Sequence, residues 1–405
     1  MSYFINLSLF RRNPNFRLLY LGQFVSFAGT MITSVALPYQ IYLITRSTLM
    51  VGLLSLFQLL PLLVTALIGG VLADRHHRRR LLLATESLLA IGCLLLAANT
   101  MLLTPHVWLI FVIATFMSAI NGLHRPALDS ITQQIVAKED YPQVGALATF
   151  KFSICMIAGP AIGGLIIANY GLLVTFIFDF ATFLISLIAL LLISHIPSPQ
   201  ANRDQSTLAA LAQGFRYAMS RQELLGTYFV DFVAMIFGMP MALFPAIALS
   251  HGGPQTLGML YSAPAVGALI ISFYSGWTNR IKRHGMAIAM AAILWGIAII
   301  CFGYTLHYLY LALGFLALAG AFDAISGIFR SIMWNQTIPN EYRGRLAGIE
   351  MISYLSGPKL GDTEAGLIAA AFGVTFSIIS GGIFCIIGVG VCCYYLPKFW
   401  HYRSE

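Results

Sequence analysis

The chain has 405 residues, of which 59% are hydrophobic and 9% are charged, and its mean hydropathy is +0.82. A soluble domain is about 45–50% apolar and about 25% charged, so this composition excludes a typical cytosolic enzyme, a disordered chain and a disulfide scaffold. The net charge of +8 would suggest nucleic-acid binding in a soluble chain. Here the basic residues follow membrane topology instead, so we predict an all-α membrane protein without a nucleic-acid partner.

Twelve apolar stretches reach the length of about 20 residues that a membrane-spanning helix needs. Long continuous runs favour helices over the short alternating strands of a barrel. Breaks are expected at Asn169–Gly171 and at Phe372–Gly373. The predicted spans are 17–44, 50–73, 81–103, 107–135, 147–169, 172–195, 226–249, 256–278, 286–305, 309–335, 346–371 and 374–396.

The basic residues predict the orientation of these spans. Lys and Arg are retained on the cytoplasmic side of a membrane. With a cytoplasmic N-terminus, all of the 23 Lys and Arg residues fall in inner loops except Arg46, Arg125, Lys151, Arg330 and Lys359. Both termini are therefore expected in the cytoplasm. The first span is long, lacks a small-residue cleavage site and precedes eleven more, so we expect it to be a mature helix rather than a signal peptide.

A polar segment divides the chain into two halves. We predict an N-terminal six-helix bundle at 1–196, a cytoplasmic linker at 197–225 and a C-terminal six-helix bundle at 226–405. Leu208, Leu211, Phe215 and Met219 recur in the linker at helical spacing and predict an interfacial helix. The six cysteines lie in apolar runs, where reduced packing residues are expected rather than disulfides or metal ligands.

Three short matches relate the two halves at an offset of about 200 positions. The matched pairs are Gly159–Gly163 with Gly357–Gly361, Thr175–Phe176 with Thr375–Phe376, and Gln133–Val136 with Asn335–Ile338. Two halves in the same orientation predict a parallel-repeat transporter of two pseudo-symmetric bundles, with its site near the membrane midplane.

Two motifs carry a family resemblance that covers essentially the whole chain. The loop after the second span reads Gly-Gly-Val-Leu-Ala-Asp-Arg-His-His-Arg-Arg at Gly69–Arg79 and resembles the signature of major facilitator superfamily transporters, with His77 where the family has a second glycine. Gly159–Gly164 resembles the signature of drug and proton antiporters. The resemblance implies the major facilitator fold in a bacterial inner membrane, a monomer, and the proton-motive force rather than a cofactor as energy source.

Further segments are similar to bacterial siderophore exporters of this superfamily, whose relatives include macrolide efflux pumps. These segments are Asn6–Leu9, Pro14–Arg17, Pro38–Ile41, Ser47–Thr48, Val51–Leu53, Gly214–Arg216 and Gly361–Asp362. The resemblance implies export of a siderophore or a similar small acidic molecule by proton antiport with alternating access. Multidrug or macrolide efflux and siderophore import remain open as alternatives.

Gating is expected at two places. In the first, Asp74, Arg75, Arg78 and Arg79 follow Gly69 and would latch the cytoplasmic mouth through charged hydrogen bonds, with Asp129 as a partner of Arg75 or Arg78. Positive-inside retention alone would also explain the arginines. In the second, small residues allow close, bent packing that would seal the outer side. These residues are Gly159, Pro160, Gly163 and Gly164.

Charges inside spans are expensive and therefore informative. Asp362, Glu364, Asp323 and Asp179 are the candidates for carrying the coupling proton, because a carboxyl in an apolar site binds protons more readily. Lys359 and Asp362 are three residues apart and share a helix face, so a purely structural pair is the alternative. A second group lies near inner span ends and is expected to snorkel to the interface. These residues are Glu86, Lys151, Asp231 and Glu350.

Substrate contacts are expected from polar, basic and aromatic residues facing a central cavity. Arg125 and Arg330 occupy equivalent spans of the two halves and would attract an anionic substrate, unless they pair with Asp129 or snorkel inward. The remaining candidates are Gln23, Tyr39, Gln40, His124, Trp334 and Lys359. No phosphate-binding loop and no zinc-ligand spacing is found, so we expect neither ATP use, a metal site nor an enzyme. A receptor or structural subunit would not need buried acids, a repeat and two transporter signatures together.

Overall fold

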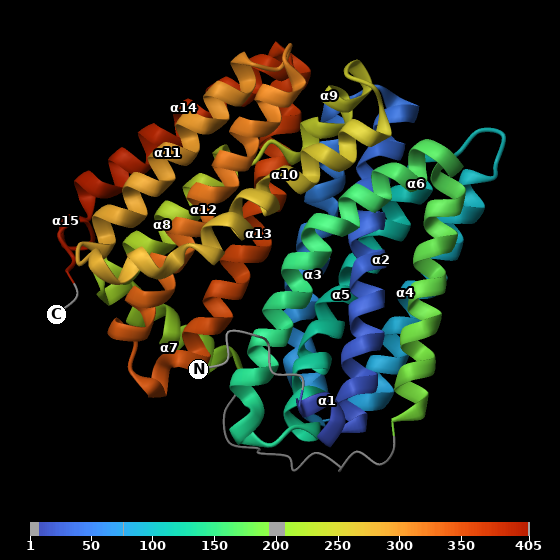
Figure 1. Cartoon of the computed structure of the whole chain (residues 1–405), viewed down its shortest axis with the longest axis horizontal. Coiled ribbons are helices and arrows are strands. Elements are labelled where there is room, and N and C mark those ends of the chain that lie inside the picture. Colours follow the sequence, from blue (N-terminus) through green and yellow to red (C-terminus); the bar gives the residue numbers. More distant parts are fainter. Residues whose placement is uncertain (1–7, 76, 194–206, 404–405) are drawn as a thin grey trace. The chain divides into compact units, whose positions relative to one another are not determined.

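The computed structural model describes residues 8–75, 77–193 and 207–403, and within these residues every element is helical (Figure 1). The predicted all-α class is confirmed. The α-helices are α1 (Ser8–Arg12), α2 (Pro14–Thr45), α3 (Thr48–Arg75), α4 (Arg78–Thr100), α5 (Val107–Ile135), α6 (Tyr141–Leu192), α7 (Thr207–Ser220), α8 (Gln222–Phe237), α9 (Phe244–Ser250), α10 (Pro254–Phe273), α11 (His284–Tyr304), α12 (Leu309–Thr337), α13 (Asn340–Phe372), α14 (Val374–Tyr395) and α15 (Pro397–Trp400). The short 3-10 turns are η1 (Lys138–Asp140), η2 (Met241–Leu243) and η3 (Ser275–Arg280).

Ten helical segments of the described chain are long and apolar enough to cross a membrane. One of them, 138–192, holds two of the predicted spans, because α6 continues through a kink at Gly171, where φ is +80°. The expected breaks are confirmed at Gly171 and at Gly373, where φ is +92°. Both positions lie in the left-handed region that glycine adopts without a steric penalty. α13 carries several charges and is not among the ten, so the count of twelve stays a prediction.

The seventh predicted span, 226–249, lies within Gln222–Ser250, which is long and apolar enough to cross a membrane, but this segment is not one continuous helix. Gly238 and Pro240 interrupt it, so that α8 ends at Phe237 and helical structure resumes at Met241 in η2 and continues into α9. Proline has no N–H for the helical ladder, and glycine disfavours a helix interior, which explains the break. The interruption leaves backbone groups inside the bundle that need partners other than their own helix.

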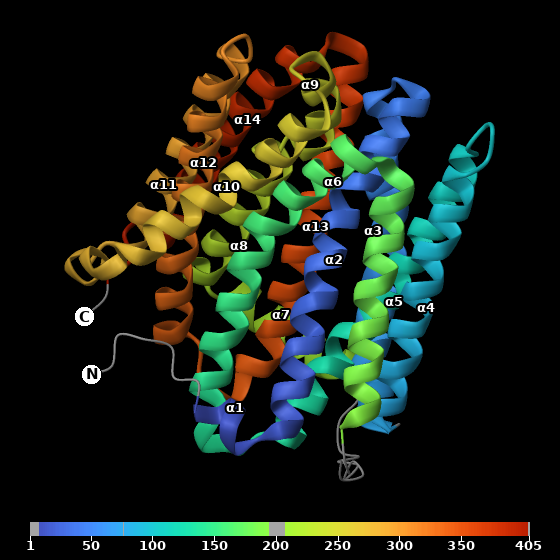
Figure 2. The same cartoon turned by 45° about the vertical axis from the view of Figure 1, so that its right-hand side comes forward.

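The chain forms two compact units. Unit 1 consists of Met1–Thr45, Phe57–Asp204 and Gly253–Gly258, and unit 2 of Arg46–Leu56, Gln205–Gly252 and Met259–Glu405. In unit 1, α2, α4, α5 and α6 lie side by side (Figures 1 and 2). In unit 2, α11 packs against α12 and α14 (Figure 2).

Large apolar side chains are also exposed on outward helix faces. Leu60 of α3, Leu95 of α4, Ile188 of α6 and Ile387 of α14 are examples. A soluble monomer rarely exposes so much contiguous apolar surface, whereas a lipid-facing surface is expected to be apolar. In the linker, α7 forms with Phe215 and Met219 exposed and with Ala218 packed against Leu224.

Candidate functional site

Asp362 of α13 is held by two other segments of unit 2. The Oγ of Ser55 on α3 donates a hydrogen bond to Asp362 Oδ2 at 2.7 Å. The backbone N–H of Ala242 donates to Oδ1 at 2.9 Å. Ala242 lies in η2, directly after the break in the seventh span, so the carboxylate caps the beginning of a helical segment, where a negative charge is favoured. Lys359, one turn earlier on α13, interacts electrostatically with Asp362.

The helices around Asp362 approach very closely. A Cβ atom on Gly52 would lie 2.7 Å from the Asp362 carbonyl oxygen, and one on Gly366 would lie 2.6 Å from the Thr48 carbonyl oxygen. Both distances are too short for a side chain. Thr48 donates to the Gly366 carbonyl at 3.1 Å, and Thr363 donates to the Gly52 carbonyl at 3.2 Å. The start of α3 and the middle of α13 are therefore joined backbone to backbone, with Asp362 at the edge of the contact.

A second cluster in unit 2 surrounds Arg330 of α12. Its guanidinium contacts the carboxylate of Asp231 on α8, and its Nη2 lies 3.8 Å from Asp323 Oδ1. Glu350 of α13 adds a third acid that interacts with Arg330. The Arg330 side chain is 10% exposed, so its charge is compensated by acids rather than free to attract an anion. Asp231, predicted to snorkel, is paired instead.

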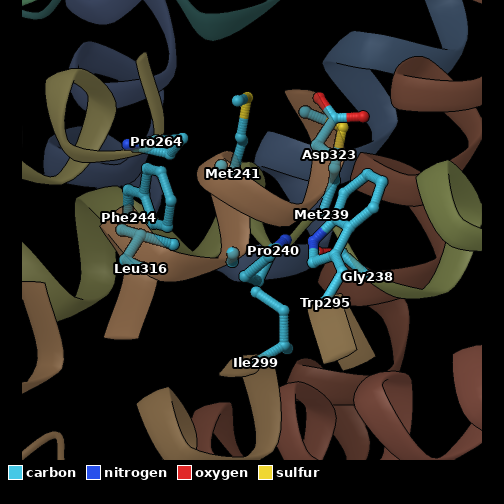
Figure 3. A pocket seen from close by; sticks show the side chains of 12 residues that line it. Gly238, Met239, Pro240, Met241, Phe244, Pro264, Trp295, Ile299, Leu316 and Asp323 are labelled. Atoms are coloured by element: carbon cyan, nitrogen blue, oxygen red, sulfur yellow. The ribbon is translucent and has the colours of Figure 1, made fainter. Parts of the chain in front are cut away.

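The interruption at Gly238 borders a small cavity of about 40 Å³ (Figure 3). The Trp295 indole N–H donates to the Gly238 carbonyl at 3.1 Å and supplies a partner for this freed backbone group. Asp323 is the charged member of the lining. The other lining residues are Gly238, Met239, Pro240, Met241, Phe244, Pro264, Trp295, Ile299, Leu316, Ala319 and Gly320. The cavity walls are aromatic, thioether and apolar with one carboxylate, and the free space is that of a few water-sized groups.

Unit 1 holds two buried acids, Asp179 and Glu86. Asp179 of α6 accepts hydrogen bonds from Thr33 of α2, from Cys93 of α4 at 3.3 Å, and from Thr182 at 3.1 Å. Seven residues along α4 from Cys93, Glu86 is 0% exposed, so the prediction that Glu86 snorkels is wrong. It fails because α2, α5 and α6 cover this face of α4, and depth counted along a helix does not reveal which face a residue occupies.

Several residues that were candidates for substrate binding form hydrogen bonds with other side chains inside the bundles. Gln23 donates to Glu86 and, at 3.1 Å, to Ser186. Gln40 donates to Thr100 at 2.9 Å, and the Trp334 indole N–H donates to Thr227 at 2.8 Å. Tyr39 is buried and Arg125 is exposed. The candidates thus divide between unit 1 and unit 2, and in unit 1 Gln23 and His124 meet at Glu86.

The gating candidates are partly described. The side chains of Asp74 and Arg75 lie outside the described residues. Arg78 donates to the Ser130 carbonyl at 3.1 Å, next to Asp129. Arg79 donates to the carbonyls of Leu190 and Leu191 at 3.0 and 2.8 Å and so caps the C-terminal end of α6, where a positive charge is favoured.

The glycine motif of α6 packs as closely as its composition predicts. A Cβ atom on Gly163 would lie 3.3 Å from the Cα of Ile32, while one on Gly159 would meet the Met31 side chain. A Cβ atom on Gly164 would lie 3.0 Å from the Gly258 backbone on α10, and one on Gly258 would lie 2.7 Å from the Pro160 carbonyl oxygen. On α3, a Cβ atom on Gly69 would lie 3.0 Å from the Gly122 carbonyl oxygen of α5.

Sequence reasoning missed several polar partners. Ser55, Thr33, Cys93, Ser186 and Trp295 each bond a group at one of these sites. Serine, threonine and cysteine are common in membrane helices, so nothing in their spacing distinguishes them from packing residues. Among the described residues, no group of three or more His, Cys, Asp and Glu is placed to hold a metal ion.

Comparison with known proteins defines the class. A family model described as transmembrane secretion effector, of the major facilitator type, matches residues 7–401. The chain therefore belongs to this family of major facilitator superfamily transporters and is a multi-pass membrane protein. The bundle architecture agrees: a bacterial homologue of the human lysosomal transporter Spinster, solved inward-facing and unoccupied, has a TM-score of 0.74 at 14% identity and covers 96% of this chain and 98% of its own. The nucleoside transporter NupG has a TM-score of 0.70 at 14% identity and covers 95% and 99%.

Among curated proteins, the chain is similar to enterobactin exporters. The exporter of Citrobacter koseri is 28% identical over 390 residues, which is 96% of this chain and 93% of that protein. The exporter of Escherichia coli O1:K1 / APEC is also 28% identical over 390 residues, with the same coverage. The similarity thus extends over both units rather than over one motif.

Proposed function

We propose that this protein exports a siderophore across a bacterial inner membrane in exchange for protons, by alternating access. The observation that carries the proposal is the similarity to enterobactin exporters over 96% of the chain. The proton-motive force would supply the energy, without a cofactor. The distribution of Lys and Arg favours cytoplasmic termini. A monomer contains all the residues that the proposal uses.

Asp362 supplies a physical basis for coupling to protons. As a carboxylate it accepts hydrogen bonds from Ser55 and from the Ala242 N–H. Protonation removes the negative charge from the beginning of η2 and weakens both charge-assisted bonds. Because the same region joins α3 to α13 through Gly52 and Gly366, a proton on Asp362 would favour separation of these helices. Loss of that proton would favour their closure.

The cavity beside Gly238 would hold part of the substrate. At about 40 Å³ it is much smaller than a ligand pocket, so it would receive only the tip of one substrate arm. Trp295 and Phe244 offer aromatic surface, and Asp323 offers an acceptor for a phenolic or amide donor. Siderophores combine aromatic or hydroxamate arms with hydrogen-bond donors, so one arm would enter here.

The first experiment tests the substrate. A deletion strain of the source organism is grown in low iron, and siderophore is measured inside and outside the cells. We expect retention inside the cells and restoration of secretion by the intact gene. Normal secretion by the deletion strain would contradict the proposal.

The second experiment tests coupling in proteoliposomes with an imposed pH gradient. Asp362→Asn is expected to lower gradient-driven export at least tenfold, because asparagine cannot take up the proton. Ser55→Ala retains the acid and is the matched control, with a smaller loss. Full gradient-driven export by Asp362→Asn would exclude Asp362 as the coupling acid, and Glu364→Gln would then be examined in the same way.

Efflux of drugs or macrolides is the second candidate function. The observation that favours it is the apolar cavity with a single carboxylate, which would also bind a lipophilic amine through Asp323. Drug susceptibility of the same deletion strain distinguishes the two functions. Hypersensitivity with normal siderophore secretion would favour drug efflux, and lowered siderophore accumulation in fed cells would favour import.

A further inference from the structure

Glu86 of α4 lies at the centre of unit 1 in a wholly enclosed polar site. Its Oε1 accepts hydrogen bonds from the Gln23 amide and from the Ser186 hydroxyl, the latter at 3.0 Å. The His124 Nε2 lies 3.3 Å from the same oxygen. Four helices, α2, α4, α5 and α6, therefore each contribute one side chain to the site. The Glu86 side chain is 0% exposed and His124 is 15% exposed.

The second carboxyl oxygen of Glu86 is different. Among the described residues, no hydrogen-bond donor reaches Oε2, although this atom is buried. An ionised carboxylate has acceptor sites on both oxygens, and leaving one without a donor is unfavourable away from water. Since Oε1 is surrounded by donors, the lone pairs that are open to a proton are those of Oε2. A proton on Oε2 would therefore displace none of these hydrogen bonds.

The charges around Glu86 point to the same behaviour. α2 presents Gln23 and α6 presents Ser186, both neutral, so His124 of α5 is the titratable group that faces the carboxyl. The other ionisable groups of these helices lie further along. Asp179 and Cys93 are two helical turns away, and Arg125 and Lys151 interact with Asp129. His124 is 15% exposed and Glu86 is 0% exposed, so the imidazole is the more accessible member of the pair.

We propose that Glu86 and His124 form a second proton-binding site, in unit 1, that takes up and releases one proton in each transport cycle. A proton from water bonds to the His124 imidazole and passes to Glu86, which leaves the imidazole neutral and the carboxyl uncharged. Release follows the same route in reverse, back to water through His124. This inference rests on the proposed proton antiport and gives it a carrier in each unit, with Asp362 in unit 2 and Glu86 in unit 1.

The test is infrared difference spectroscopy of the purified full-length protein in lipid vesicles, with no substrate present. The sample is stepped between about pH 8 and about pH 5, the range in which histidine titrates. We expect the native protein to develop the carbonyl band of a buried protonated carboxyl at the acidic end. Glu86→Gln should lose one component of this band, which Asp362→Asn and Asp179→Asn, the control at a buried acid two turns away, should both retain. A native spectrum without the band, or a Glu86→Gln spectrum identical to the native one, would overturn the inference.

His124→Gln provides the second variant in case Glu86→Gln does not fold. This variant keeps a polar side chain but removes the imidazole through which the proton is proposed to pass, so the Glu86 component should form at least tenfold more slowly after the pH step. An unchanged rate would show that His124 is not part of the site. Because these readouts use no substrate, they remain valid if siderophore export fails its own test. Conversely, normal siderophore secretion by the deletion strain would leave the infrared result untouched.

Discussion

Two groups of buried acids are held in different ways. In unit 1, Glu86 and Asp179 are bonded by an amide, hydroxyls and a thiol, with His124 beside Glu86. In unit 2, Arg330 is shared by Asp231 and Asp323, whereas Asp362 of the same unit is held by neutral donors as in unit 1. A guanidinium compensates the charge of a buried acid, and neutral donors do so only in part. The comparison therefore sets the ion-paired cluster around Arg330 against the acids that have neutral donors.

The largest expected effect comes from breaking the pair in unit 2. Arg330→Met leaves Asp231 and Asp323 without their cation, and removing one partner of a buried pair costs about 3–5 kcal/mol of unfolding free energy. We expect the purified variant to unfold at a clearly lower temperature in detergent.

The control for this variant is the double substitution Arg330→Met with Asp231→Asn. It removes the uncompensated charge and should recover much of the loss. If Arg330→Met were as stable as the native protein, the acids around it would have to be held by other groups.

An intermediate effect is expected from filling the space beside Asp179. A Cβ atom on Gly29 would collide with the Asp179 carboxylate and the Thr182 hydroxyl. Gly29→Ala should therefore lower the unfolding free energy by about 1–3 kcal/mol, as overpacking does. Gly145→Ala, on α6 with nothing within 4 Å of an added Cβ, is the matched control and should be neutral or slightly stabilising. Equal stability of the two variants would mean that the Asp179 site is loosely packed.

The smallest effect concerns a single hydrogen bond. Thr33→Val keeps the shape of the side chain but removes the hydroxyl that donates to Asp179. Hydrogen bonds between membrane helices contribute about 0.6 kcal/mol on average and up to about 1.7 kcal/mol, so we expect a loss near 1 kcal/mol. Ser34→Ala, whose hydroxyl bonds only within its own helix turn at the exposed side, should change stability by less than about 0.5 kcal/mol. If Thr33→Val lowered the unfolding free energy no more than Ser34→Ala, the hydrogen bond from Thr33 to Asp179 would contribute little to stability.

Some features of the site were predictable and others were not. Asp362 and Asp323 stand out in the sequence because a charge within an apolar run is conspicuous whatever surrounds it. Glu86 was assigned to the wrong environment, since its distance from the helix end predicts exposure while its helix face decides burial. The sequence leaves Arg330 open to attracting an anion, pairing with Asp129 or snorkelling. Asp231, the acid that it contacts in the structure, is 99 positions away in the sequence, and no local pattern relates the two.

The sequence by itself determined the helical membrane class and the breaks at Gly171 and Gly373, because hydropathy and glycine conformations act locally. Only the tertiary structure decided which polar side chains meet. It interrupts the seventh span at Gly238, joins α3 to α13 through Gly52 and Gly366, and encloses Glu86 among α2, α5 and α6. The physical reason is that a buried polar group needs a partner, and partners on neighbouring helices are chosen by packing in three dimensions rather than by spacing along the chain.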